Sequence, residues 1–218
     1  MITKLNEGLK RLDLSLDDSQ LKFLEIYIKE ILSFNKTYNL MKADSEDELA
    51  VNHILDSLAA VKHIQDLALS FNRPLNQISI GDIGSGGGCP GIPLAIALPE
   101  VNFTLVERME KRCAFLETAI KKTGIKNAKV LCSPADSVKS ESFDIEVFRA
   151  FHPFDKKIVK LLFNMLKKNG YVAAYKARSE KIEAEMKEVE SLVKDYTKIP
   201  LSVPFLEDHE RNLVVIKH

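Results

Sequence analysis

The chain has 218 residues, with 31 Lys and Arg residues against 31 Asp and Glu residues, so its formal net charge is zero. A hydrophobic fraction of 45% and a charged fraction of 28% are ordinary for a globular protein with a well-buried core. No apolar run approaches the roughly 20 residues that a membrane helix needs, and the N-terminal segment does not have the pattern of a signal peptide. These features predict a cytoplasmic protein that makes no membrane contact.

Cysteine usage points to the same compartment. The three cysteines, Cys89, Cys113 and Cys132, are odd in number and far apart. They form no C-x-x-C pair, so the pattern predicts neither a zinc site nor a disulfide framework. We therefore expect no metal ion, and reduced thiols fit a cytoplasmic protein.

Residues 1–70 are predicted to be helical. Asp17 and Gln20 form a capping-box pattern ahead of an apolar stripe at helical spacing, and Ser45 with Glu48 forms a second such start. From about residue 77 the pattern changes to short apolar runs that alternate with helical periods. We expect a helical extension over residues 1–70 and a second domain over residues 71–218.

The second domain is predicted to be α/β. Strands are expected near 77–83, 101–106, 127–132, 143–149 and 171–176, and helices near 91–98, 110–122, 156–167 and 179–194. Such alternation implies right-handed crossovers and a parallel sheet covered on both faces. Two further strands, 196–203 and 212–217, leave no room for a helix between them. They should pair as an antiparallel hairpin at the sheet edge.

Charge is distributed unevenly in this domain. Residues 149–178 contain eight basic side chains and one acid, Asp155. Such a stretch is either the solvated face of a lysine-rich helix or a contact for a polyanion, and a charge run by itself favours the solvated face.

The turn after the first predicted strand carries the strongest functional signal. Five glycines lie within residues 84–91, between an apolar strand and a helix start. Glycine allows the backbone to turn tightly and to approach a ligand closely. The helix that follows directs its free N–H groups and the positive end of its dipole at the turn. This pattern predicts a site for a nucleotide-like cofactor.

Polar residues at the ends of the next strands strengthen this prediction. Glu107 follows the glycines at the spacing of a carboxylate that accepts the ribose hydroxyls, Asp136 follows the third strand, and Arg149 ends the fourth. Because ligands bind beyond the carboxyl ends of strands in open α/β sheets, the three residues together favour an adenosine site. Singly, they also fit a helix cap, a turn acid and a cation that neutralises Asp82.

Several segments follow one another in an order that is typical of one family. They are Asn35–Leu40 (Asn-Lys-Thr-Tyr-Asn-Leu), His53–Ala59, Asp82–Gly88, Pro90–Leu94, Lys111-Arg112, Arg149-Ala150 and Arg211–Ile216. From about residue 20 to its end, the chain resembles the bacterial small-subunit ribosomal RNA guanine-N7 methyltransferases, also called glucose-inhibited division protein B.

The resemblance implies a class I Rossmann-like, S-adenosylmethionine-dependent methyltransferase. Its fold would be a mostly parallel seven-stranded sheet with a C-terminal antiparallel hairpin and an N-terminal helical extension. Its reaction would be N7-methylation of a specific guanine in 16S rRNA, and its partner that RNA or the small ribosomal subunit or its precursor. We expect it to act as a monomer.

Carried over by position, the resemblance also implies site residues. The cofactor contacts would fall on Gly84, Gly86, Cys89, Glu107, Ala135, Asp136 and Arg149. Arg149 is also the candidate catalytic residue, placed to meet either the base or the carboxylate of the cofactor. Near the ends of the later strands, RNA phosphates would be held by Lys176, Arg178 and Arg211.

Two other functions stay open at this level. A nicotinamide-dependent oxidoreductase also uses a glycine-rich turn, but the chain has no convincing Tyr-x-x-x-Lys site. A non-catalytic RNA- or ribosome-binding module would keep the fold without turnover. Among single residues, His53 is predicted to make a structural hydrogen bond, and Phe34 and Tyr38 are predicted to pack in the core of the extension rather than stack on a base.

Overall fold

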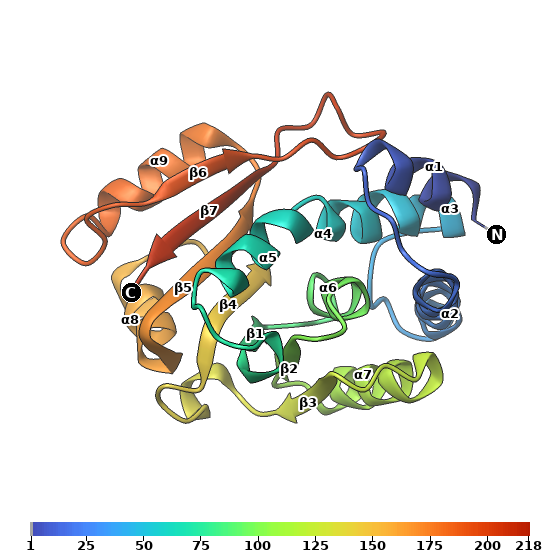
Figure 1. The fold of residues 1–218 in the computed structure, drawn as a ribbon, viewed down its shortest axis with the longest axis horizontal. Coiled ribbons are helices and arrows are strands. Elements are labelled where there is room, and N and C mark those ends of the chain that lie inside the picture. The colour runs from blue at the N-terminus through green and yellow to red at the C-terminus, as the bar shows by residue number, and fades with distance from the viewer. Residues whose placement is uncertain (1) are drawn as a thin grey trace.

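The computed structural model describes residues 2–218, and a twisted seven-stranded sheet runs through its centre (Figure 1). The strands are β1 Ser79–Ile83, β2 Asn102–Glu107, β3 Ala128–Cys132, β4 Phe143–Arg149, β5 Leu166–Lys176, β6 Thr197–Pro200 and β7 Asn212–Lys217. Their order is β3-β2-β1-β4-β5-β7-β6. Strand β7 is antiparallel to β5 and β6, and the other pairs are parallel. The predicted sheet and its terminal hairpin are confirmed.

Helices cover the two faces unequally. The larger layer contains α1 Thr3–Arg11, α2 Asp18–Asn35, α3 Glu46–Leu49, a π-helical segment Ala50–Leu55, α4 Asp56–Leu58, α5 Val61–Leu69, α6 Gly91–Ala97 and α7 Glu110–Thr123. The other face is covered by α8 Lys156–Met165 and α9 Ser179–Glu188 (Figure 1). Short 3-10 turns occur at Leu75–Gln77 and Ala135–Ser137.

The N-terminal helices share a continuous hydrophobic core with the sheet. Leu24 and Ile28 of α2 belong to the same buried cluster as Ile80 of β1 and Leu116 of α7. Helix α2 begins as predicted, because the Asp17 side chain accepts a hydrogen bond from the Gln20 N–H while the Gln20 side chain accepts one from the Asp17 N–H. The extension is thus packed against the sheet rather than tethered to it.

Strand β5 differs most from the prediction. The helix expected over 156–167 ends at Met165, and the strand expected from residue 171 begins at Leu166. Leu166 pairs with Phe143, but the register then shifts and pairing resumes at Tyr171, so residues 167–170 form an irregularity in the ladder. Asn169 then adopts a left-handed φ of 63° and interrupts the apolar pattern. The last hairpin also has a shorter first strand than the predicted 196–203.

The cysteine prediction is wrong for one pair. Cys113 of α7 and Cys132 of β3 form a disulfide bond, with their Cα atoms 5.7 Å apart. They are 19 residues apart in sequence, but β3 pairs with β2 so that Cys132 lies opposite Glu107. Helix α7 starts just after Glu107, which brings Cys113 to the same place. Cys89 is a buried free thiol.

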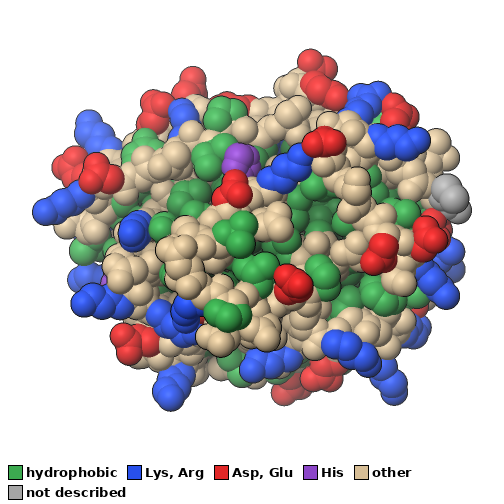
Figure 2. Space-filling model, viewed as in Figure 1, with side chains coloured by type: hydrophobic (Ala, Val, Ile, Leu, Met, Phe, Trp, Pro, Cys, Tyr) green, Lys and Arg blue, Asp and Glu red, His purple; other side chains and the backbone are tan. Residues whose placement is uncertain are grey.

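The basic stretch is divided between surface and interior. Lys156, Lys157 and Lys160 are exposed on α8, whereas Lys167 and Lys176 form ion pairs. In Figure 2, Lys and Arg side chains lie mostly around the outline and are interspersed with acidic ones. None of the helices within residues 2–218 combines the length and the apolar character needed to span a membrane.

Candidate active site

The glycine-rich turn between β1 and α6 is fixed against the end of β2. Gly84, Gly86 and Gly88 have φ values of 70°, 60° and 95°, a region that residues with a side chain rarely adopt. The N–H group of Gly84 donates to the carbonyl of Val106, and that of Gly86 donates to Oε2 of Glu107 at 2.9 Å. The turn therefore has one defined conformation beside a buried carboxylate.

Asp82 of β1 holds the far side of the turn. Its Oδ2 accepts hydrogen bonds from the Ser85 hydroxyl at 2.6 Å and from the Gly91 N–H at 3.0 Å. Burial raises the pKa of the Asp82 carboxyl to about 6, although both hydrogen bonds and the charge of Arg149 favour its ionised form. Its Oδ1 has no hydrogen-bond partner within residues 2–218.

A crevice of about 460 Å³ lies beside the turn. Four of the predicted cofactor residues line it: Gly84, Glu107, Ala135 and Asp136. Oε1 of Glu107 accepts the N–H groups of Arg108 and Met109, both at 2.9 Å, while Oε2 accepts the Gly86 N–H and lies 4.0 Å from Nη1 of Arg112. Glu107 is 4% exposed, so its remaining acceptor capacity is directed at this crevice rather than at bulk water.

Cys89 does not line the crevice. Its thiol is buried beneath the turn, 3.4 Å from the hydroxyl of Tyr27 of α2, and that hydroxyl donates to the Gly87 carbonyl at 2.5 Å. Burial raises the pKa of the Cys89 thiol. This residue supports the turn from the core side.

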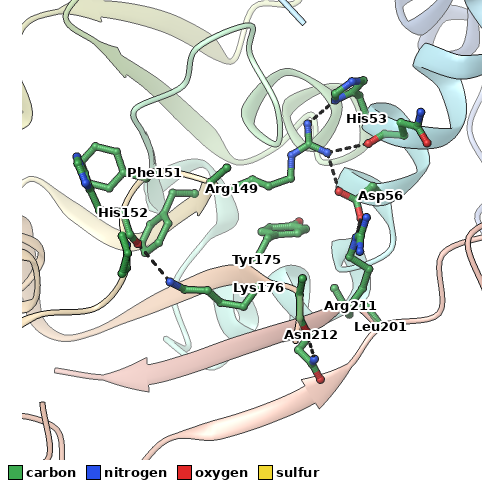
Figure 3. Close-up of a pocket in the computed structure, with 15 residues that line it drawn as sticks. His53, Asp56, Arg149, Phe151, His152, Tyr175, Lys176, Leu201, Arg211 and Asn212 are labelled. Atoms are coloured by element: carbon green, nitrogen blue, oxygen red, sulfur yellow. Dashed lines mark hydrogen bonds and ion pairs between the residues drawn. The ribbon is translucent and has the colours of Figure 1, made fainter. Parts of the chain in front are cut away.

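A second cavity, of about 580 Å³, lies at the ends of β4 and β5 (Figure 3). Arg149 lies on its wall, and its guanidinium group donates to the carbonyl of Asn52 at 3.0 Å and to Asp56 Oδ2 at 2.6 Å. It also donates to Nδ1 of His53 at 2.7 Å. Arg149 thus pairs with Asp56 and not with Asp82, and it lies in this second cavity rather than in the crevice beside the turn.

His53 has the structural role that was predicted. Its Nε2 lies 3.3 Å from the carbonyl of Lys42, while Nδ1 faces Arg149. Burial, followed by the charge of Arg149, lowers the pKa of the imidazole. A neutral ring that donates from Nε2 and accepts at Nδ1 satisfies both contacts.

The three residues predicted to hold RNA lie in different surroundings. Arg211 lines the second cavity and donates from Nε to Asp56 Oδ1 at 3.0 Å. Lys176 also lines it, but its ammonium group is paired with Glu185 at 2.6 Å. Arg178 is exposed just before α9 and does not line the cavity.

Phe151 borders both cavities. It lines the crevice and the second cavity, and its ring packs on Gly84, where an added Cβ atom would collide with it. Ala150, just before it, has a left-handed φ of 55°, which turns the chain sharply after β4. His152 also lines both cavities.

The aromatic residues of the extension lie elsewhere. The Phe34 ring packs against Tyr38 and Phe115, with centroids 5.0 and 4.9 Å apart. The predicted core packing is wrong for Tyr38, which is 44% exposed and lies under the ammonium group of Lys111. Neither Phe34 nor Tyr38 lines the two cavities described above.

Sequence reasoning missed several residues of the second cavity, above all Asn52, Asp56, Tyr175 and Leu201. Asn52 and Asp56 come from the helical extension, which the strand-end rule does not cover. The signal for Asp56 was the segment His53–Ala59, which the resemblance had singled out without a role, and Asn52 lies directly before that segment.

Fold and site together define a class I Rossmann-like methyltransferase of the S-adenosylmethionine-dependent kind. A solved S-adenosylmethionine-dependent methyltransferase from Aquifex aeolicus superposes with a TM-score of 0.53 at 13% identity, covering 73% of this chain and 90% of that one. The structure of P. horikoshii TYW2 in complex with MeSAdo gives 0.51 at 11% identity, over 71% of this chain and 61% of that one.

Sequence comparison defines the family more closely. The family described as rRNA small subunit methyltransferase G matches residues 20–214. Proteins named ribosomal RNA small subunit methyltransferase G are 35% identical in Treponema denticola, over 98% of this chain and 93% of that protein, and 31% identical in Neisseria meningitidis, over 98% and 96%. The chain belongs to this family.

The residues of the crevice fit S-adenosylmethionine. Gly84 lines the crevice, whereas Gly86 does not and acts by donating its N–H group to Glu107. The buried carboxylate of Glu107 stands where ribose hydroxyls need an acceptor, and the loop with Ala135 and Asp136 lines the same crevice.

Proposed function

We propose that the protein transfers a methyl group from S-adenosylmethionine to N7 of a guanine in 16S rRNA. Membership of the rRNA small subunit methyltransferase G family supports the substrate class. The structural observation that carries the proposal is the pair of cavities that share Phe151 as a common wall at the carboxyl ends of the strands. One cavity has the adenosine-binding features, and the other is open to a base.

Bound in the crevice, S-adenosylmethionine would supply an electrophilic methyl group whose bond to sulfur breaks as the bond to nitrogen forms. Guanine N7 carries an in-plane lone pair and no proton, so no side chain has to remove one. The residues of the chain instead align the two reactants, and alignment alone contributes several kcal/mol to such reactions. Glu107 would hold the ribose, and Phe151, which borders both cavities, would contact the adenosyl group and the base where the two meet.

The substrate must present its base outside a duplex. N7 lies in the deep, narrow major groove of A-form RNA, which side chains cannot read, so the target guanine has to be unpaired or flipped. The cavity of about 580 Å³ has aromatic walls in Phe151 and Tyr175 and cationic groups in Arg149 and Arg211. These groups suit one base and a phosphate beside it.

Lys176 would contact RNA from the wall of this cavity, and the exposed Arg178 would contact it further from the base. We also propose that the protein acts in the cytoplasm as a monomer, on 16S rRNA or on the small subunit or its precursor. No step requires a metal ion.

Radiolabelled methyl transfer tests the proposal. Small-subunit RNA and small subunits that lack the modification are incubated with the protein and [methyl-³H]S-adenosylmethionine. We expect label on one guanine, at which borohydride and aniline then cleave the RNA, as they do at 7-methylguanosine. Label without cleavage would overturn the choice of N7.

Calorimetry separates the remaining alternatives. S-adenosylmethionine should bind and NAD should not, and the reverse result would favour an oxidoreductase. Intact cofactor binding without any transfer to RNA would overturn the substrate and leave a non-catalytic RNA-binding module.

A further inference from the structure

The loop that follows α2 presents an aromatic ring to solvent in a fixed position. Asn35, the last residue of α2, holds this loop at its other end. Its side-chain amide donates to the carbonyl of Met41 at 2.7 Å, and its Oδ1 accepts the N–H groups of Leu40 at 3.1 Å and Met41 at 3.3 Å. Residues 36–39 are exposed between these anchors, so the ring of Tyr38 is held outward by a closed loop.

The surface beside Tyr38 is aromatic. Helices α2 and α7 lie side by side (Figure 1), and a groove of about 270 Å³ between them has Phe34, Tyr38 and Phe115 on its walls. Glu30, the carboxylate on its wall, is paired with Lys122 at 2.7 Å. The groove therefore offers the flat faces and edges of rings to a ligand, and its own carboxylate is already compensated.

The charge around this ring is positive. Segments 35–41 and 108–112 together contain four basic side chains and one acid. With Glu107, which lies 4.0 Å from Arg112, the excess is two positive charges. The four bases are Lys36, Arg108, Lys111 and Arg112, and the acid is Glu110. An exposed ring among basic side chains is typical of surfaces that bind single-stranded nucleic acid.

The loop places Tyr38 next to both cavities. The ammonium group of Lys111 lies 4.8 Å from the ring centroid of Tyr38, and the next residue, Arg112, lines the crevice. On the other side, the carbonyl of Lys42 lies 3.3 Å from Nε2 of His53, which lines the second cavity. RNA whose target base occupies the second cavity can therefore follow the loop to the ring of Tyr38.

We infer that Tyr38 is a stacking platform for an unpaired base of the rRNA strand that flanks the target guanine. The inference rests on the proposed function for the choice of RNA. In the free protein, the ammonium group of Lys111 covers the ring through a cation–π contact. Such a contact at an exposed site contributes less than the stacking of a base, so an arriving base displaces the ammonium group. The freed ammonium group then pairs with the phosphate of the stacked nucleotide.

An apolar segment of a ribosomal protein is the less favoured occupant. It would cover the ring, but it would leave the excess positive charge of the two segments without a partner. A nucleotide supplies a flat base and a negative phosphate together, and so matches both features of the surface.

Three substitutions of Tyr38 separate stacking from simple apolar contact. Tyr38→Ala removes the ring, and affinity for RNA should fall by about 5–150-fold, which is the measured range for loss of one base–aromatic stack. Tyr38→Leu keeps apolar bulk without a flat ring and should lose nearly as much. Tyr38→Phe keeps the ring and should bind within about twofold of the wild type. Filter binding to naked small-subunit RNA measures the three dissociation constants.

Methylation kinetics show that the ring acts in binding. Tyr38→Ala should raise KM for undermodified small subunits by the same factor and keep kcat within about threefold, because the stack is present before and during methyl transfer. Activity is expressed per active site, counted by S-adenosylhomocysteine titration, so that misfolded molecules do not contribute. Tyr196→Ala is the matched control. Tyr196 is an exposed tyrosine just before β6, at the opposite edge of the sheet from β3, and its removal should change neither KM nor kcat.

Salt dependence separates the ring from the ammonium group. Lys111→Gln removes one phosphate contact, so the slope of log affinity against log salt should become shallower by about 0.7–0.9. Tyr38→Ala should leave this slope unchanged, because a stacked ring releases no counterion. Lys121→Gln, at an exposed position in the last turn of α7, is the control and should keep the wild-type slope. An unchanged slope for Lys111→Gln would overturn the role of Lys111.

Different results overturn different statements. If the wild type methylates no RNA while Tyr38→Ala still weakens RNA binding, the proposed function is overturned and the platform remains. A methylating wild type together with normal RNA affinity for Tyr38→Ala, or for Tyr38→Leu, would overturn the inference alone. A loss of affinity for small subunits but not for naked RNA would also overturn it, by assigning Tyr38 to a contact with a ribosomal protein.

Discussion

Glu107 connects the glycine-rich turn, the start of α7 and the crevice through one side chain. Its two oxygens hold the N–H groups of Gly86, Arg108 and Met109. Its position was predictable, because the end of a second strand after a glycine-rich turn has a fixed place in this type of sheet. The hydrogen bonds that orient it were not, since they come from backbone groups whose directions depend on the folded turn.

The Glu107→Gln variant should bind S-adenosylmethionine about 10–100-fold more weakly, because a hydrogen bond to a charged group contributes about 1.5–3 kcal/mol. RNA affinity should stay unchanged. Isothermal titration calorimetry measures the first and filter binding the second. Glu117→Gln, an exposed position on α7, is the control. Unaltered cofactor affinity would remove Glu107 from the cofactor site.

Glu146 in the middle of β4 makes the stability depend on pH. It is fully buried, and neither carboxyl oxygen has a hydrogen-bond partner among the residues described. Burial raises its pKa well above the ordinary value of 4.5. The folded protein therefore keeps the proton while the unfolded chain releases it. This contribution to stability is complete below pH 4.5 and is lost as the pH rises toward the raised pKa.

Glu146→Gln cannot ionise, so its stability relative to the wild type should increase between about pH 5 and about pH 8, by at most about 1.4 kcal/mol per pH unit. Urea unfolding at both pH values measures the difference. If the difference between the two proteins were the same at both pH values, the wild-type carboxyl would not be protonated in the fold.

At the scale of elements, α2 braces the glycine-rich turn from behind. The Tyr27 hydroxyl donates to Gly87, and the Gln20 side chain donates to the carbonyl of Ile96 at the end of α6. Start signals of such helices can be read from sequence, as the capping box of Asp17 and Gln20 shows. Contacts between residues 60 or more positions apart cannot be predicted in this way, because a local sequence pattern does not show which other element a helix will pack against.

Tyr27→Phe leaves the buried carbonyl of Gly87 without its donor. We expect a loss of about 1–3 kcal/mol in unfolding free energy, because an unsatisfied buried acceptor costs that much. Cofactor affinity should fall by less than tenfold, since the turn keeps its contacts with β2. Denaturant unfolding and calorimetry measure the two effects. The exposed Tyr38→Phe variant should change neither, and equal losses in both variants would contradict a bracing role for α2.

The disulfide bond between Cys113 and Cys132 closes a loop that includes most of α7 and β3. Sequence rules predict disulfide bonds from cysteine spacing. This bond was not predictable in that way, because the parallel register of β2 and β3 brings the two cysteines together. A loop of this length is expected to contribute about 3 kcal/mol to stability. Dithiothreitol should therefore lower the urea midpoint of the wild type and leave that of Cys113→Ser unchanged. Thiol titration of the unfolded, non-reduced wild type should detect Cys89 alone, and three thiols would contradict the bond.

At the scale of the whole molecule, one sheet edge collects groups from both halves of the chain. Strand-end residues such as Glu107, Asp136 and Arg149 were predictable, because parallel strands bring their carboxyl ends to one edge. The split into two cavities was not. It depends on Phe151 turning onto Gly84 and on the extension delivering Asp56 to Arg149, and both are tertiary contacts.

The basic face of α8 should contribute to RNA binding through charge alone. Each phosphate contact steepens the dependence of log affinity on log salt by about 0.7–0.9. Replacing three exposed lysines with Gln should thus reduce the slope by about 2. They are Lys156, Lys157 and Lys160. Filter binding to small-subunit RNA over a range of salt concentrations measures the slope of log affinity against log salt. The control variant replaces three exposed lysines of α1 and α2, namely Lys10, Lys22 and Lys29. If the slope for the α8 variant were unchanged, the basic face of α8 would be an ordinary solvated surface.

The shared core of extension and sheet also bears on how the chain is made. Ribosomes synthesise α2 well before the turn that it braces, since Tyr27 and Gly87 are 60 residues apart. At about 5–20 residues per second, the apolar stripe of α2 waits several seconds for its partners. During that interval it is exposed to chaperones and to other nascent chains. Helix α2 is therefore synthesised several seconds before it can reach its final packing against α6 and α7.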